Sequence, residues 1–122
     1  MHELSIVSSV VESVTESLRN YPGARVTEVR LRVGVLSAVI EDSLQFCYGI
    51  AIDGTPLAGS RLVITTVPVT VYCRECDCET ALDSLQSFRC PRCGAPSEEV
   101  RHGRELEIEA IEIEQPEEAA TP

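Results

Sequence analysis

Four cysteines form two pairs with the same internal spacing, Cys73-x2-Cys76 and Cys90-x2-Cys93. Two such pairs can bring four thiolates to one tetrahedral metal ion. Structural Zn²⁺ sites commonly use this ligand set, with Zn–S bonds of about 2.3 Å. A site closed by four sulfur ligands leaves no coordination position for a substrate. The spacing therefore predicts a structural zinc site, and further chemistry must be sought elsewhere in the chain.

Other interpretations of these cysteines remain open. Iron could occupy the same four-sulfur set. CxxC pairs also serve as redox dithiols. Such motifs normally lie at a strand-to-helix junction of a thioredoxin-like fold, and two CxxC pairs in a zinc-ribbon-like segment do not fit that pattern. Cys78 extends the first pair to Cys73-x2-Cys76-x-Cys78, so ligation could shift from Cys76 to Cys78. The symmetry with the second pair favours Cys76, and we expect Cys78 to be a spare thiol.

Composition excludes several classes of function. The chain has 122 residues and a formal net charge of −10, and all ten basic residues are arginine. Such an acidic chain with 4% aromatic residues argues against binding of nucleic acid. It has no run of eighteen apolar residues and no leader-like start, so we expect no membrane span and a cytoplasmic location.

The chain also lacks the signatures of an enzyme. It has no glycine-rich phosphate loop and no serine or cysteine nucleophile in a recognisable pattern with a histidine base. A zinc-dependent hydrolase would need a three-ligand site with an open position, which four cysteines do not offer. We therefore expect a protein that is not an enzyme.

Apolar periodicity predicts two helices. In the first, apolar residues recur at steps of three and four, and the helix should stop near Tyr21-Pro22-Gly23. Its expected apolar stripe comprises Leu4, Val7, Val10, Val11, Val14 and Leu18. A second helix ends at Asp53-Gly54-Thr55-Pro56 and should bury Ile40, Leu44, Cys47 and Ala51.

Alternation predicts three strands. Val29, Leu31, Val33 and Val35 alternate with polar or small residues, and a second strand should run from about Arg61 to Tyr72, with Pro68 at an edge or bulge. The third strand begins at Leu106, and its apolar phase slips near Ala110 and Ile111, which predicts a β-bulge.

These elements predict an α+β fold in which two helices lie on a three-stranded sheet, with an inserted zinc-ribbon-like module. We expect residues 1–70 plus 100–114 to form one domain, residues 71–99 the zinc-binding domain, and residues 115–122 a disordered tail. The cysteine segment has few apolar residues of its own. Metal should therefore supply much of its folding free energy, on the order of 10 kcal/mol.

Several segments together resemble one known family. They are the opening Met1-His2-Glu3-Leu4-Ser5, a turn at Arg32-Val33-Gly34, the two cysteine pairs, and Gly103-Arg104-Glu105-Leu106. In this order and separation they resemble the HypA/HybF family of nickel metallochaperones up to about Glu114. The resemblance implies a nickel-binding domain, a zinc domain, cooperation with the HypB GTPase, and delivery of Ni²⁺ to the large subunit of NiFe-hydrogenase.

The nickel site that the resemblance implies lies at the first residues. Ni²⁺ accepts square-planar nitrogen ligands. The imidazole of His2, backbone nitrogens including that of Glu3, and the amine of Met1 are candidate nitrogens. Without the resemblance, the simplest interpretation of His2 is a solvated terminal residue. We expect His102 in a loop before the last strand. There it would be either a solvated residue or an extra nickel ligand. We expect a monomer or a weak, domain-swapped dimer.

One alternative function comes from a different class. Zinc ribbons also serve as interaction modules for nucleic acid or transcription proteins, without any role in nickel delivery. Such a module should carry a basic stripe with aromatic residues, which this acidic chain does not offer.

Overall fold

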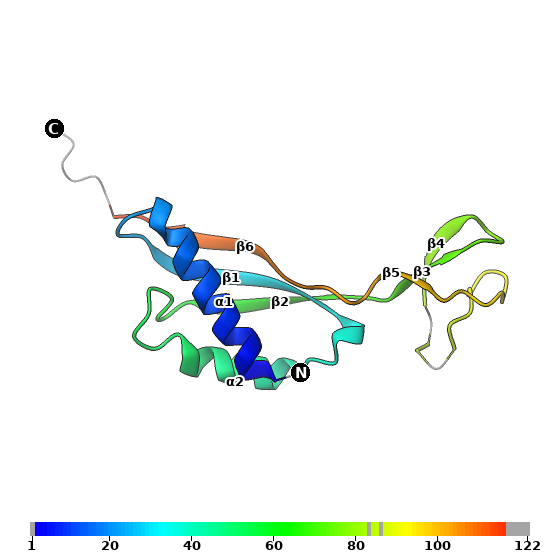
Figure 1. The fold of residues 1–122 in the computed structure, drawn as a ribbon, viewed down its shortest axis with the longest axis horizontal. Helices are drawn as coiled ribbons and strands as arrows, with labels where there is room; N and C mark the ends of the chain where they lie inside the picture. The colour runs from blue at the N-terminus through cyan, green and yellow to red at the C-terminus, as the bar shows by residue number, and fades with distance from the viewer. Residues whose placement is uncertain (1, 83, 86, 117–122) are drawn as a thin grey trace. The chain divides into compact units, whose positions relative to one another are not determined.

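A computed structural model describes residues 2–82, 84–85 and 87–116 (Figure 1). The chain divides into two compact units. Of the described residues, the first unit contains 2–31, 39–64 and 108–116, and the second contains 32–38 and the described part of 65–107. The predicted assignment of nickel and zinc to separate domains stays a prediction, because these units are defined by packing alone. Most of the predicted tail, at 117–122, lies outside the described residues.

Helix α1 spans Glu3–Ser17 and continues into a 3₁₀ turn, η1, at Leu18–Asn20. Its buried face differs from the predicted stripe, because Leu4 is more than half exposed while Ile6 is buried. The stripe is therefore rotated, and it comprises Ile6, Val7, Val10 and Val14. The chain turns away after η1, where Gly23 takes a left-handed conformation with φ of 79°.

Helix α2 spans Glu41–Ala51 and packs against α1. It ends before the predicted turn residues, but the predicted buried set was partly wrong. Leu44, Tyr48 and Ile52 are buried at steps of four, whereas Ile40 is 62% exposed and Cys47 is only half-buried. Tyr48 faces inward because its ring packs in the core while its hydroxyl forms a hydrogen bond with the Ser60 hydroxyl at 2.6 Å.

The first sheet has the strand order β2-β1-β6, and Figure 1 shows α1 crossing it. Its strands are β1 (Arg25–Gly34), β2 (Arg61–Val67) and β6 (Leu106–Glu114). As predicted, Val29, Leu31 and Val33 are buried and the last strand returns to this sheet. Arg32-Val33-Gly34 is the end of β1 rather than a turn, and Val35 follows in a 3₁₀ turn, η2 (Val35–Ser37).

Glu28 is a buried acid on the central strand, with only 3% of its surface exposed. Arg30 Nε donates to one carboxylate oxygen at 2.6 Å, and Arg61 Nη2 donates to the other at 2.7 Å. The hydrogen bond from Arg30 is the main reason that the pKa of Glu28 is lowered. Two guanidinium partners thus satisfy a charge that burial alone would penalise.

The second sheet, with strand order β4-β3-β5, is antiparallel and lies in the second unit. Its strands are β3 (Thr70–Cys73), β4 (Cys78–Ala81) and β5 (Glu99–His102). The prediction of one strand from 61 to 72 was wrong, because the chain leaves the first sheet after Val67 and enters the second at Thr70. Pro68, which has no N–H to donate, lies at this break.

The fold class of two helices on a three-stranded sheet is confirmed, and the second small sheet is an addition that the sequence did not predict. Among the described residues, no helix has the length and apolar character needed to cross a membrane.

Candidate metal centre

The four predicted cysteine ligands converge in the second unit. The sulfur atoms of Cys73, Cys76, Cys90 and Cys93 all lie within 4.8 Å of one another. Cys73 and Cys93 are separated by 3.6 Å between sulfurs, and Cys76 and Cys90 by 3.9 Å. A tetrahedron with metal–sulfur bonds of 2.3 Å has sulfur–sulfur edges of about 3.8 Å. The group therefore has the size that one tetrahedral ion requires.

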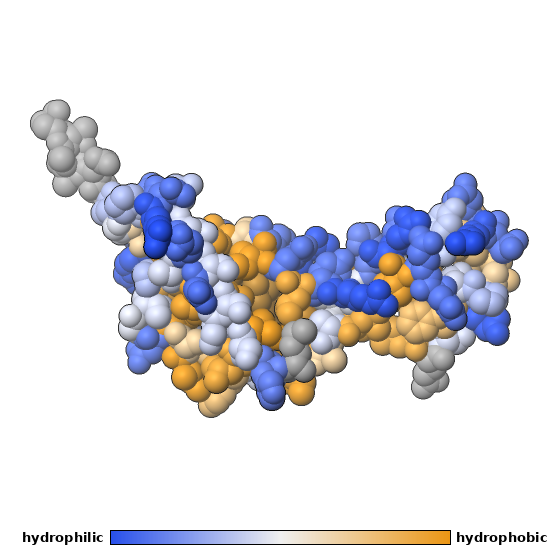
Figure 2. Space-filling model, viewed as in Figure 1, coloured by the Kyte–Doolittle hydropathy of each residue, from blue (hydrophilic) through white to orange (hydrophobic). Residues whose placement is uncertain are grey.

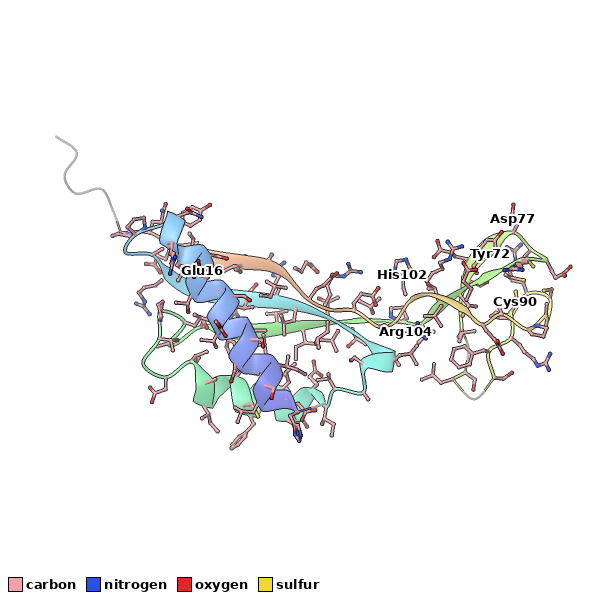
Figure 3. All side chains as sticks on the ribbon, viewed as in Figure 1. Glu16, Tyr72, Asp77, Cys90, His102 and Arg104 are labelled. Atoms are coloured by element: carbon pink, nitrogen blue, oxygen red, sulfur yellow. The ribbon has the colours of Figure 1, made fainter. Side chains whose placement is uncertain are left out.

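Two similar turns aim these sulfurs inward. In each pair the residue after the second cysteine is left-handed: Asp77 has φ of 50° and Gly94 has φ of 78°. Glycine adopts this conformation freely, whereas aspartate needs support. Tyr72 supplies it, because its hydroxyl donates to Asp77 Oδ1 (both labelled in Figure 3). A side-chain hydrogen bond in the first turn thus does what glycine does in the second.

Backbone groups also support the sulfur of Cys90 (labelled in Figure 3), which is buried together with that of Cys73. Arg92 N–H points at Cys90 Sγ at 3.4 Å, and Gly94 N–H donates to the Cys90 carbonyl at 2.7 Å. Burial opposes ionisation of this thiol, but hydrogen bonds from the N–H groups of Cys93 and Arg92, together with those from the side chains of Thr80 and Cys73, lower its pKa to about 6. These hydrogen bonds favour the thiolate form of Cys90.

Cys76 behaves in the opposite way. Its contact with the Cys93 sulfur, its burial and its contacts with the sulfurs of Cys90 and Cys73 raise the pKa of its thiol to about 12. Four sulfurs at this separation resist becoming four thiolates unless a cation compensates their charge. A divalent metal at the centre would do so, which is why such sites couple metal binding to folding.

Cys78 stands apart from the four-sulfur group, which is the only cluster of potential ligands found in the described part of the chain. It starts β4 and is the ladder partner of Cys73. Its sulfur accepts a hydrogen bond from Arg92 Nη1 at 3.3 Å. The Arg92 side chain thus donates to the Cys78 sulfur, while its backbone N–H donates to the Cys90 sulfur.

The second candidate site is the start of α1. His2 is the residue before the helix and has an extended backbone. Its side chain is exposed, and its carbonyl accepts the N–H groups of Ser5 and Ile6 at 3.1 and 3.2 Å. The first N–H groups of a helix have no partner within it, so the backbone nitrogen of Glu3 is not committed to the helix. Met1 lies outside the described residues.

The Glu3 carboxylate is held by the other helix. Its Oε2 accepts the N–H of Ile40 at 3.2 Å, at the residue directly before α2. This hydrogen bond is the main reason that the pKa of Glu3 is lowered. The contact therefore links the start of α1 to the residue directly before α2.

His102 is placed differently from the predicted loop, because it is the last residue of β5 (Figure 3). Its Nδ1 lies 3.0 Å from Glu105 Oε2, and its Nε2 lies 3.6 Å from Glu79 Oε1. The imidazole is half exposed and is bracketed by two carboxylates. Its two ring nitrogens face separate carboxylates rather than the cysteine sulfurs.

Comparison with known proteins agrees with this arrangement. The family model described as "Hydrogenase/urease nickel incorporation, metallochaperone, hypA" matches residues 1–113. The hydrogenase maturation factor HypA of Chloroflexus aurantiacus is 45% identical over 112 residues, covering 92% of this chain and 98% of that protein. The HypA of Roseiflexus sp. is 47% identical over 114 residues, covering 93% of each chain.

The fold is also found in solved structures. The solution structure of the Ni metallochaperone HypA from Helicobacter pylori has a TM-score of 0.66 at 20% identity and covers 95% of this chain and all of that one. A second solution structure of a HypA protein has a TM-score of 0.70 at 19% identity, covering 95% and 98%. The match over nearly the full length, together with the four-cysteine group, leads to one conclusion: the chain belongs to the HypA family of hydrogenase maturation factors.

Proposed function

We propose that this chain binds Ni²⁺ through His2 and adjacent nitrogens and delivers it during maturation of NiFe-hydrogenase. The observation that carries the proposal is the start of α1. It combines an exposed imidazole, a backbone nitrogen outside the helical hydrogen bonds and an ordered neighbour at Glu3. Imidazole and backbone nitrogens suit square-planar Ni²⁺. An exposed site can also release its ion without opening a core.

We assign a structural Zn²⁺ to Cys73, Cys76, Cys90 and Cys93. Four soft thiolates in a tetrahedral arrangement suit Zn²⁺, whereas Ni²⁺ is served by the nitrogen-rich terminus. The assignment separates the metal that stabilises the protein from the metal that is its cargo. The second unit buries few large apolar side chains, so metal binding and its folding should be linked.

The proposed setting is the cytoplasm, where reduced thiols are available for metal binding. The proposed partners are the HypB GTPase and the hydrogenase large subunit, and the family description also names urease. We propose no nucleic-acid or membrane partner, and a monomer or a weak, domain-swapped dimer. The sequence has no phosphate-binding loop of its own, so GTP hydrolysis falls to the partner.

Nickel titration of untagged, zinc-loaded protein tests the proposal. The unmodified chain should bind one nickel per chain, and His2→Ala should abolish this binding while zinc content stays unchanged. His102→Ala is the matched control, because His102 is the other histidine of the chain. The terminal site would be wrong if His2→Ala binds nickel as tightly as the unmodified protein does.

A further inference from the structure

Helix α2 has two apolar faces, of which the fold uses one. Leu44, Tyr48 and Ile52 are buried against the rest of the first unit. On the opposite side, Phe46 is 71% exposed and Ile50 is 58% exposed. Figure 2 shows the resulting apolar surface where α2 lies in Figure 1. A surface helix ordinarily turns polar residues outward, so this outer face needs an explanation.

Gly49 lies between Phe46 and Ile50 in the sequence of α2 and is itself exposed. A Cβ added there would meet nothing within 4 Å, and the residue does not have a positive φ. Glycine weakens a helix interior relative to alanine. Neither backbone conformation nor packing inside the chain requires it. A glycine that the chain itself does not need, flanked by Phe46 and Ile50, forms a notch that permits close approach from outside.

The charges around this face indicate what approaches. Asp42 precedes Phe46 by four residues on the same side of the helix, and Asp53 lies in the turn that follows α2, with its N–H donating to the Ile50 carbonyl. Helix α2 contains no basic residue, and the whole chain has a net charge of −10. A second copy of this chain on the same face would place its acidic residues against Asp42 and Asp53, which is unfavourable. The complementary occupant is an apolar segment with Lys or Arg on both sides.

We propose that the α2 outer face, formed by Asp42, Phe46, Gly49, Ile50 and Asp53, docks an apolar, basic-flanked segment of a partner protein in nickel transfer. The inference rests on the proposed function. Ile40, directly before α2, donates its N–H to Glu3, so a protein docked on α2 lies close to the start of α1. The apolar side chains of Leu4, in the first turn of α1, and of Ile40, directly before α2, are also exposed.

The test uses the unmodified chain, Phe46→Ala and Gly49→Ala, with the purified HypB GTPase as the probe. Phe46→Ala should weaken binding about tenfold or more, because it removes a bulky exposed anchor. Gly49→Ala should raise the Tm of the free protein by roughly 4 °C and still weaken binding, because its methyl group fills the notch. Opposite effects on stability and binding are not expected from a merely structural residue.

Tyr21→Ala is the matched control, since Tyr21 is an exposed aromatic residue in the same unit but not on α2. It should bind as the unmodified chain does. Equal affinities for all variants, or no binding by the unmodified chain, would overturn the docking surface. So would sedimentation data showing that Phe46→Ala abolishes self-association, which would make the occupant a second copy. Nickel titration of each variant separates these failures from a failure of the nickel site, because all three should retain nickel binding.

Discussion

Cys73 provides a residue-scale test of the zinc assignment, because its sulfur is buried and lies 3.6 Å from that of Cys93. Cys73→Ser should remove a soft ligand from a closed site, release zinc and unfold the second unit. The helical circular dichroism signal should remain, because both helices lie in the first unit. Nickel binding should also largely persist.

Cys78→Ser is the control for this experiment, because Cys78 lies outside the four-sulfur group. It should retain one zinc per chain. A full zinc equivalent in Cys73→Ser, measured by metal analysis, would show that the ligand set is wrong and make Cys78 the first suspect.

The lowered pKa of Glu105 predicts that the stability of the folded protein depends on pH. The N–H groups of Gly103 and of Glu105 itself, together with His102, lower its pKa from 4.5 to about 2. A lowered pKa in the folded state means that the stabilisation is complete above pH 4.5 and is lost as the pH falls towards 2. Glu105→Gln should therefore be less stable at pH 7. Its difference from the unmodified protein in denaturant midpoint should shrink below pH 4.5, and a constant difference would contradict this role.

At this scale the sequence predicted residues whose chemistry is local. The spacing of two cysteine pairs identified the four sulfurs that the structure brings together. It could not identify Glu28, because the arginines that make its burial tolerable come from β1 and β2, and only the sheet brings them together. Nor did it predict the role of Asp77, whose strained turn depends on Tyr72.

At the scale of elements, Gly34 marks a close approach of two backbones. A Cβ on Gly34 would lie 2.2 Å from the carbonyl carbon and oxygen of Gly103. The N–H of Gly34 donates to Glu105 O, and that of Leu36 donates to Gly103 O, both at 2.7 Å. Gly34 therefore joins η2 and the end of β1 to the chain before β6.

Gly34→Ala should destabilise the protein by about 2–4 kcal/mol, because neither backbone can move without losing these hydrogen bonds. Chemical denaturation measures the loss. Gly49→Ala is the contrasting control, because its added methyl meets open space and should stabilise α2. Equal stability of Gly34→Ala and the unmodified protein would mean that the close approach relaxes.

Element boundaries were more predictable than element faces. Helix ends followed from the turn residues after each helix, whereas the inward face of α2 depended on Tyr48 finding Ser60 across the core. The half-buried positions of β6 change phase between Ile108 and Ile111, as the sequence indicated. Residues 61–72 divide between two sheets because β2 pairs with β1 whereas β3 pairs with β4 and β5. The apolar periodicity of one segment does not show which strands it will pair with.

At the scale of the whole molecule, the proposed function assigns different coordination chemistry to each metal. The sulfur set is held by two turns whose left-handed residues fix its shape. Among the described residues, the start of α1 is held by the helix itself and by the contact of Glu3 with Ile40. A structural ion benefits from ligands that two turns hold in place. A transported ion benefits from ligands at a chain terminus, which can move apart and release it.

The last prediction tests whether nickel uses the amine of Met1 together with His2. A histidine-free Gly-Ser extension before Met1 should weaken nickel binding, because it crowds the site and converts that amine to a far less basic amide. The same extension after Pro122 should have no effect, because it leaves His2 and Glu3 unchanged. Calorimetric titration of both proteins at equal zinc loading measures the difference. Equal affinities would exclude the Met1 amine as a ligand and leave the imidazole of His2 with internal donors to bind the ion.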